Sequence, residues 1–372
     1  MLPVPRSPSQ TPRALPAPHA VLLHQNLCFS GQTERTVATA RALEEAGYRV
    51  SIVTSSGTRT RAVEQLGFKP ILAEFALDPW RNPFSAMRTR RLIKSLKPSI
   101  VHATSNSLAP LLTTIAPSLR VPWIQELHRP VASTLLSNRA NFAATIVNSE
   151  SLIESVVNHG GVPRSQVRTI KNAPTPFVPE KPTQPFDHSG PPRIGCSGLL
   201  DDEHATAWFL EAARLMVLSG TRAMFVVLGE GPNESAIRRF IRGNGLNEHI
   251  TVAVPTTNSA AESLSALDVH VSCKLEGGPG WLACQAVVQA IPSVFVAAGD
   301  AYELVEDKSN GILIEPNDSR RLADELTLLC TQTERARAMG LRGRARFLET
   351  TSPVAFGQEI AELYESALGA AV

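Results

Sequence analysis

Residues Ser272 to Glu303 read SCKLEGGPGWLACQAVVQAIPSVFVAAGDAYE, and this is the most informative stretch of the chain. Apolar residues alternate at the end of a strand over Leu267 to Val271, and the small residues of Trp281 to Ala290 predict a helix. The turn between them carries a carboxylate and three glycines: Glu276, Gly277, Gly278 and Gly280. Glycines let the backbone approach a ligand closely, and the N–H groups at a helix N-terminus are free to bind it. The turn therefore predicts a binding site for an anion such as a diphosphate.

The same alternation of strands and helices occurs on both sides of a proline-rich stretch. Prolines stand at 174, 176, 179, 182, 185, 191 and 192, where they forbid a helix and disfavour a central strand. The pattern predicts an α/β protein with two doubly wound parallel sheets, which bind ligands at the carboxyl ends of their strands. We expect a disordered leader over residues 1–18, a first domain over 19–173, a linker over 174–192, a second domain over 193–352 and a last helix over 353–372.

The composition of the chain limits the classes of function that it can have. The formal net charge of +2 over 372 residues gives no general attraction for nucleic acid. The five cysteines form no CxxC pair, which favours reduced thiols and a cytoplasmic protein. No segment is apolar over the length that a membrane span requires, so any membrane contact is expected to be peripheral. The basic stretch Arg335 to Arg346 could touch anionic lipid, but a solvated helix face is the preferred interpretation.

The ordered series of motifs resembles glycosyltransferase family 4, whose members are retaining enzymes of the GT-B fold. The resemblance covers roughly residues 19 to 369 and includes the glycine loop Ser30 to Arg35, the strand Ile194 to Gly198 and the turn Phe225 to Pro232, which reads FVVLGEGP. Its most specific part is the donor-site signature, carried by Ser272, Glu276, Gly277, Pro292, Gly299 and Glu303.

The resemblance implies a hexosyltransferase that moves a sugar from a nucleotide-diphosphate donor to a glycan, lipid-linked or small-molecule acceptor. The first domain would hold the acceptor and the second the donor, and the last helix would cross back to the first domain. The nucleotide sugar is a co-substrate, and neither a cofactor nor a metal is expected, since no Asp-x-Asp pair is present. None of the motifs specifies the nucleotide, the sugar, the acceptor or the oligomeric state.

The resemblance also assigns roles to residues. Glu276 would accept hydrogen bonds from sugar hydroxyls, and His128 would reach the sugar near the reaction centre, although a histidine at a strand end can simply bond its own loop. The expected donor-binding residues are Gly31, Gly198, His204, Lys274, Gly277, Gly278, Gly280, Gln285 and Glu303.

Three positions depart from the family pattern. The second glutamate of the signature falls on Gln285, nine positions after Glu276 instead of eight, so either one residue is inserted near Gly278 to Gly280 or Glu276 stands in a register opposite Cys284. The arginine and lysine that would offset the diphosphate are Leu199 and His204. We therefore keep two hypotheses: an active retaining glycosyltransferase, which is favoured, and a catalytically degenerate GT-B protein that binds a sugar or a partner. An epimerase on the same fold is less consistent with the motif order.

Overall fold

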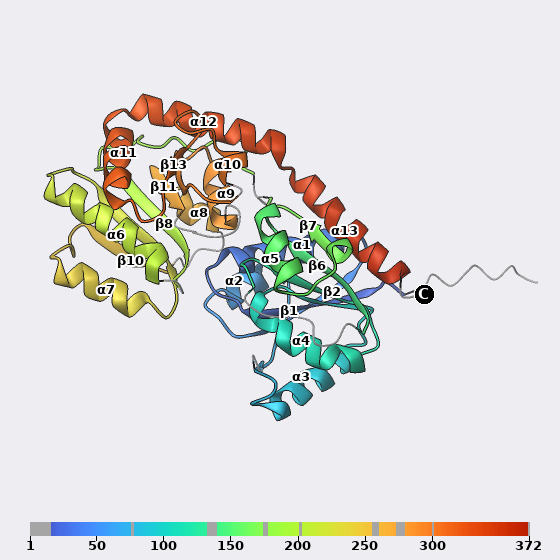
Figure 1. The fold of residues 1–372 in the computed structure, drawn as a ribbon. Helices are drawn as coiled ribbons and strands as arrows, with labels where there is room; N and C mark the ends of the chain where they lie inside the picture. The colour runs from blue at the N-terminus through green and yellow to red at the C-terminus, as the bar shows by residue number, and fades with distance from the viewer. Residues whose placement is uncertain are drawn as a thin grey trace, which may run out of the picture.

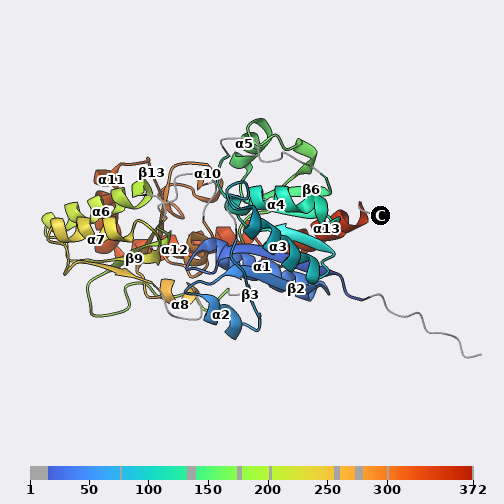
Figure 2. The same ribbon diagram turned by 90° about the horizontal axis from the view of Figure 1, so that it is seen from below.

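The computed structural model describes residues 16–75, 78–131, 140–173, 178–200, 203–254, 260–272, 280–299 and 301–370. Within them the chain forms two parallel sheets, each covered by helices on both faces (Figure 1). Figure 2 shows from below that the two domains lie side by side. The prediction of two doubly wound parallel sheets is confirmed.

The N-terminal sheet has seven strands in the order β3-β2-β1-β4-β5-β6-β7. Its strands are β1 (His19–Asn26), β2 (Arg49–Ser55), β3 (Ile71–Leu72), β4 (Ile100–Ala103), β5 (Trp123–Leu127), β6 (Phe142–Val147) and β7 (Val167–Thr169). Its helices are α1 (Gly31–Glu45), α2 (Thr60–Gln65), α3 (Pro83–Ser95), α4 (Ala109–Ile115) and α5 (Ile153–Asn158). The central strands are nearly continuous apolar runs because both faces of the sheet are covered.

The C-terminal sheet has six strands in the order β10-β9-β8-β11-β12-β13. Its strands are β8 (Arg193–Leu199), β9 (Met224–Glu230), β10 (Ile250–Ala253), β11 (Val269–Ser272), β12 (Ser293–Val296) and β13 (Ile312–Ile314). Its helices are α6 (Glu203–Leu218), α7 (Glu234–Gly243), α8 (Ala260–Leu264), α9 (Trp281–Val288), α10 (Ala301–Leu304), α11 (Ser319–Thr331) and α12 (Thr333–Thr350).

Strand β11 begins later than the sequence pattern suggests. The apolar alternation predicts a strand from Leu267, but the strand starts at Val269. The backbone N–H of Leu267 donates to the carbonyl of Leu264 at 2.9 Å and closes the turn after α8. Leu267 is buried because its side chain packs beside Gly195 of β8, not because it belongs to the strand.

The last helix, α13 (Pro353–Gly369), lies on the N-terminal domain (Figure 1). Ser352 caps it by accepting from the N–H of Ala355 at 3.3 Å, and the fixed φ of Pro353 suits its first turn. Phe356, Ile360 and Tyr364 are buried in the same apolar cluster as α1. This helix therefore fastens the end of the chain to the domain in which the chain began.

The arginines of α12 bind other parts of the protein. Arg335 and Arg342 are exposed, as a solvated face requires. Four arginines of this helix nevertheless donate to backbone carbonyls of distant segments: Arg337 to Pro185, Arg342 to Ser309, Arg344 to Pro179 and Arg346 to Leu304. The segment therefore combines a solvated face with contacts that hold the linker.

Candidate active site between the two domains

The N-terminal ends of α1 and α9 meet between the domains. Ser30 caps α1 by accepting from the N–H of Thr33 at 3.2 Å, and Gly280 is the residue before the first turn of α9. A Cβ on Gly31 would lie 2.9 Å from the Cβ of Trp281, closer than side chains approach. Glycine at position 31 therefore permits the contact, and two positive helix ends face the same region.

A carboxylate of the second domain accepts hydrogen bonds from the first domain. The N–H of Phe29 donates to Glu230 Oε1 at 2.6 Å, and the hydroxyl of Thr58 donates to the same oxygen. Glu230 ends β9 within the sequence Gly-Glu-Gly-Pro. Sequence reasoning identified this turn but missed its glutamate, and an acidic residue between two glycines was the available signal.

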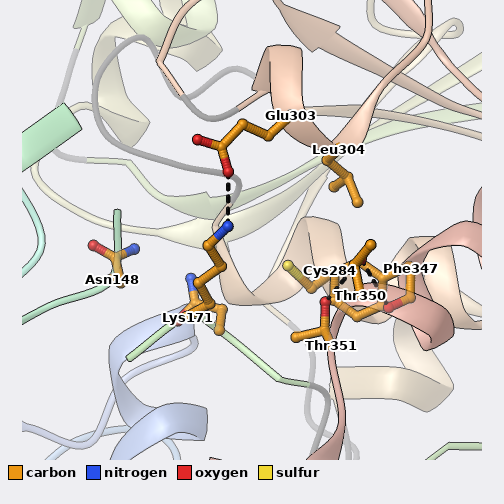
Figure 3. A pocket seen from close by; sticks show the side chains of 9 residues that line it. Asn148, Lys171, Cys284, Glu303, Leu304, Phe347, Thr350 and Thr351 are labelled. Atoms are coloured by element: carbon orange, nitrogen blue, oxygen red, sulfur yellow. Dashed lines mark hydrogen bonds and ion pairs between the residues drawn. The ribbon is translucent and has the colours of Figure 1, made fainter. Parts of the chain in front are cut away.

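A pocket of about 140 Å³ is lined by residues of both domains (Figure 3). Its N-terminal wall is formed by Asn148, Lys171 and Asn172, and its C-terminal wall by Cys284, Glu303, Leu304, Phe347, Thr350 and Thr351. Lys171 Nζ lies 2.7 Å from Glu303 Oε2, and both side chains are about half exposed. The predicted donor residue Glu303 thus forms an ion pair with the opposite domain.

Gln285 lies on α9 with 4% of its surface exposed. Its Oε1 atom is buried and accepts no hydrogen bond from the described residues. Leaving a buried acceptor unsatisfied costs about 1 to 3 kcal/mol, so this oxygen is suited to receive a hydroxyl or N–H of a ligand.

His128 follows β5 and is buried in its own domain. Its backbone N–H donates to Asn106 Oδ1 at 2.8 Å, and its Nε2 lies 3.2 Å from the carbonyl of Thr104. Burial, together with a smaller electrostatic effect of the neighbouring His128, lowers the pKa of His24 to about 4. His128 is therefore held by its own loop, and its reach to a sugar stays a prediction.

Arg35 holds the part of the N-terminal pocket wall that contains Lys171. Its guanidinium is fully buried, pairs with Glu126 and donates to the carbonyl of Ile170 at 2.9 Å and to Asn172 Oδ1 at 3.0 Å. It also lies 5.0 Å from the centre of the Phe356 ring. Arg35 thus joins α1, the segment just before the linker and α13. The sequence analysis assigned this arginine only a place in the glycine loop.

The remaining predicted residues are placed only in part. Gly198 is the last residue but one of β8 and has a φ of 149°, which favours glycine. His204 lies on α6, and its side chain is not described. Lys274, Glu276, Gly277 and Gly278 lie outside the described residues. In the part of the chain that the structure describes, no three His, Cys, Asp or Glu side chains are grouped to hold a metal ion.

Two family models match this chain, one for each domain. Residues 29–173 match Glycosyltransferase Family 4, and residues 191–332 match Glycosyl transferases group 1. The chain belongs to the glycosyltransferases. The two matched ranges agree with the two domains of the structure, since the first ends before the prolines of the linker and the second begins at the end of those prolines.

Characterised relatives of this glycosyltransferase are distant. It is 26% identical over 284 residues, 72% of the chain, to an exopolysaccharide phosphotransferase of Streptomyces coelicolor, of which 29% is covered. Over 130 residues, 33% of the chain, it is 27% identical to a GDP-mannose-dependent α-(1-6)-phosphatidylinositol monomannoside mannosyltransferase of Mycobacterium tuberculosis, of which 34% is covered. The matches therefore span about a third of these relatives' own length.

Solved structures show the fold of this glycosyltransferase. The HepE protein of Anabaena in complex with UDP and glucose superposes with a TM-score of 0.77 at 17% identity, covering 94% of this chain and 99% of that one. Sucrose-phosphate synthase of Thermosynechococcus elongatus superposes with a TM-score of 0.73 at 16% identity, covering 95% and 100%. The predicted GT-B fold is confirmed.

Proposed function

We propose that the protein transfers a sugar from a nucleotide-diphosphate donor to a glycan, lipid-linked or small-molecule acceptor with retention of the anomeric configuration. The observation that carries this proposal is the buried Oε1 of Gln285, which accepts no hydrogen bond from the residues that the structure describes. It lies on α9 at the position where the family pattern has the carboxylate that holds the ribose hydroxyls. A ribose hydroxyl of the donor would donate to it.

The helix ends supply the second part of the argument. Transfer leaves a nucleoside diphosphate, whose growing charge must be stabilised. Free N–H groups at the start of α9, with those of the preceding glycines, would face the phosphates. The nearby start of α1 would add to the positive potential, which compensates in part for Leu199 and His204 at positions where the family has cations.

Donor binding tests the proposal directly. We would titrate the protein calorimetrically with UDP, GDP, ADP and dTDP and with their common sugar conjugates. One nucleotide should bind, and Gln285→Ala should weaken it by about tenfold, in line with a lost hydrogen bond. Gln358→Ala on the exposed face of α13 is the matched control and should leave affinity unchanged.

The roles of Glu276 and Gln285 should be distinguished by comparing the binding of the sugar conjugate with that of the free nucleotide. Glu276→Ala should weaken the sugar conjugate but leave the free nucleotide unaffected, because its expected partners are sugar hydroxyls. Equal losses for both ligands would contradict that role. Gln285→Glu should strengthen nucleotide binding, because a carboxylate is the stronger acceptor.

The alternative is a degenerate GT-B protein that binds a sugar or a partner without catalysis. It is favoured by Leu199 and His204 at the two cationic positions and by the bonds that already join the domains, Lys171 to Glu303 and Phe29 to Glu230. Sugar transfer or donor hydrolysis would exclude it. Absence of binding across the nucleotide panel would exclude the transferase.

A further inference from the structure

The α3 region of the N-terminal domain is strongly basic, and the acidic Asp78 in the turn before the helix pairs with Arg81 at 3.3 Å. The whole chain is balanced, with 36 Lys and Arg against 34 Asp and Glu. The segment from Pro79 to Ser99 contains no acidic residue, although it contains Arg81, Arg88, Arg90, Arg91, Lys94 and Lys97. These residues belong to α3 and the turns at its two ends, so the local charge departs sharply from that of the chain.

Helix α3 has an inner and an outer face. Ala86, Thr89 and Ile93 are buried against the domain at helical spacing. Besides Pro83 and Ser95 at its two ends, the exposed residues also follow helical spacing, and they are Phe84, Met87, Arg88, Arg91 and Lys94. The outer face is therefore apolar at the start of the helix and basic towards its end.

The turn before α3 presents a second aromatic side chain. Asp78 Oδ1 accepts from the N–H groups of Trp80 and Arg81 at 3.1 and 3.2 Å, and Asn82 caps the helix by accepting from Ser85. Trp80 is 83% exposed and Phe84 is 74% exposed. Because hydrogen bonds form this turn, the two rings project from a defined structure.

The basic side chains on the outer face of α3 do not hold distant parts of the protein together, as the arginines of α12 do. Within the described residues, the side chains of Arg88, Arg91 and Lys94 make no hydrogen bond or ion pair. The arginines of α12, in contrast, reach the carbonyls of Pro185 and Pro179. The charge of α3 is thus available to a partner.

The position of this surface suits an extended partner. Helix α3 forms the lower edge of the molecule (Figure 1) and lies nearest the viewer in the view from below (Figure 2). The turn with Trp80 leads from β3 into α3, so it lies at the carboxyl edge of the sheet, the edge that also bears Phe29 and His128. A partner on α3 would lie beside the entrance to the proposed site.

We propose that the turn and outer face of α3 bind a bilayer that contains anionic phospholipids. The charge is complementary to such a surface, and Trp and Phe beside Lys and Arg are the residues that enter the interface between headgroups and acyl chains. A soluble polyanion would explain the charge but would leave the two exposed rings without a role. None of the described helices could cross a membrane, so the contact is peripheral.

Tryptophan fluorescence makes the test specific. The chain has 4 tryptophans; Trp80 is exposed, whereas Trp123, Trp208 and Trp281 are at most 3% exposed. Vesicles of phosphatidylcholine with phosphatidylglycerol should bind the full chain in sedimentation and shift its emission to the blue. Brominated lipid should quench the shifted emission. Neither effect depends on a sugar donor, so the result is independent of the proposed function.

Two variants and a matched control separate the contributions. Trp80→Ala with Phe84→Ala and, separately, Arg88→Glu with Arg91→Glu should each weaken vesicle binding by about tenfold or more. Arg239→Glu with Arg242→Glu reverses the same charge at the same spacing on exposed positions of α7, and it should bind as the wild type does. Circular dichroism spectra of all variants should match.

Three outcomes would overturn the proposal. These are absence of vesicle binding by the wild type, equal binding to pure phosphatidylcholine, and equal weakening by the α7 variant. A polyanion site would instead be indicated if polyphosphate bound to the wild type and the Trp80 and Phe84 substitutions had no effect on vesicle binding.

Discussion

The carboxylate of Glu230 accepts a 2.6 Å hydrogen bond from the backbone N–H of Phe29, and this bond joins residues 201 positions apart in different domains. The same oxygen accepts from Thr58. Together with the ion pair of Lys171 and Glu303 on the pocket wall, the bond between Glu230 and Phe29 holds the carboxyl edges of the two sheets against each other.

Replacing Glu230 should open this arrangement. Hydrogen bonds to a charged group contribute about 1.5 to 3 kcal/mol each, so Glu230→Ala should shift the domains apart. Small-angle X-ray scattering should show a larger radius of gyration than for the wild type. Glu234→Ala, which removes only the surface pair with Arg238, is the control. Identical scattering from Glu230→Ala and wild type would show that the contact does not hold the domains.

A methyl group at position 31 should disturb the contact of the helices. The added Cβ would lie 2.9 Å from that of Trp281, and overpacking of this kind costs about 1 to 3 kcal/mol. We expect Gly31→Ala to lower the thermal midpoint or increase the radius of gyration.

Gly243→Ala provides the matched control because a Cβ there meets nothing within 4 Å at the end of α7. It should be neutral or stabilising by up to about 1 kcal/mol. If Gly31→Ala were equally neutral, the two helix ends would be farther apart in solution.

The contribution of the hydrogen bond between α13 and the N-terminal sheet can be measured by removing a single oxygen atom. His102 Nδ1 lies 2.9 Å from the hydroxyl of Tyr364, and both side chains are fully buried. Tyr364→Phe leaves the histidine nitrogen without this partner, so urea unfolding should show a loss of about 1 to 3 kcal/mol. Tyr302→Phe, at a residue that is 58% exposed, should cost much less; equal losses would argue against the buried bond.

Acid should destabilise the C-terminal domain through His270. Burial lowers the pKa of this side chain from 6.5 to about 4. Below pH 6.5 the unfolded chain binds a proton that the folded chain does not, so stability is full above that pH and falls as the pH drops towards 4, by up to roughly 3 kcal/mol.

Urea midpoints measured at pH 7 and pH 5 would reveal this loss. His270→Asn should reduce the difference between the two pH values, whatever its effect on stability at pH 7. An unchanged difference would assign the acid sensitivity to other groups, among them His24 and His102, whose pKa values burial also lowers to about 4.

Local signals predicted the elements well. The small residues of Trp281 to Ala290 predicted a helix, and a last helix was expected from Pro353; α9 and α13 occupy these positions. The strand expected from Leu267 was placed two residues too early, because burial of Leu267 comes from packing under β8 and not from strand pairing. Apolar pattern alone does not distinguish these two causes.

The amino-acid sequence was enough to predict the order of strands and helices, the two sheets and the glycine turns at their carboxyl edges, because periodicity, capping and backbone freedom act over a few residues. The tertiary structure was needed to show that Glu230 meets Phe29, that Arg35 joins the segment before the linker to α13, that Gln285 Oε1 has no partner among the described residues and that Trp80 and Phe84 stay exposed. These contacts depend on how two domains dock, and residues that meet across them have no fixed spacing in the chain.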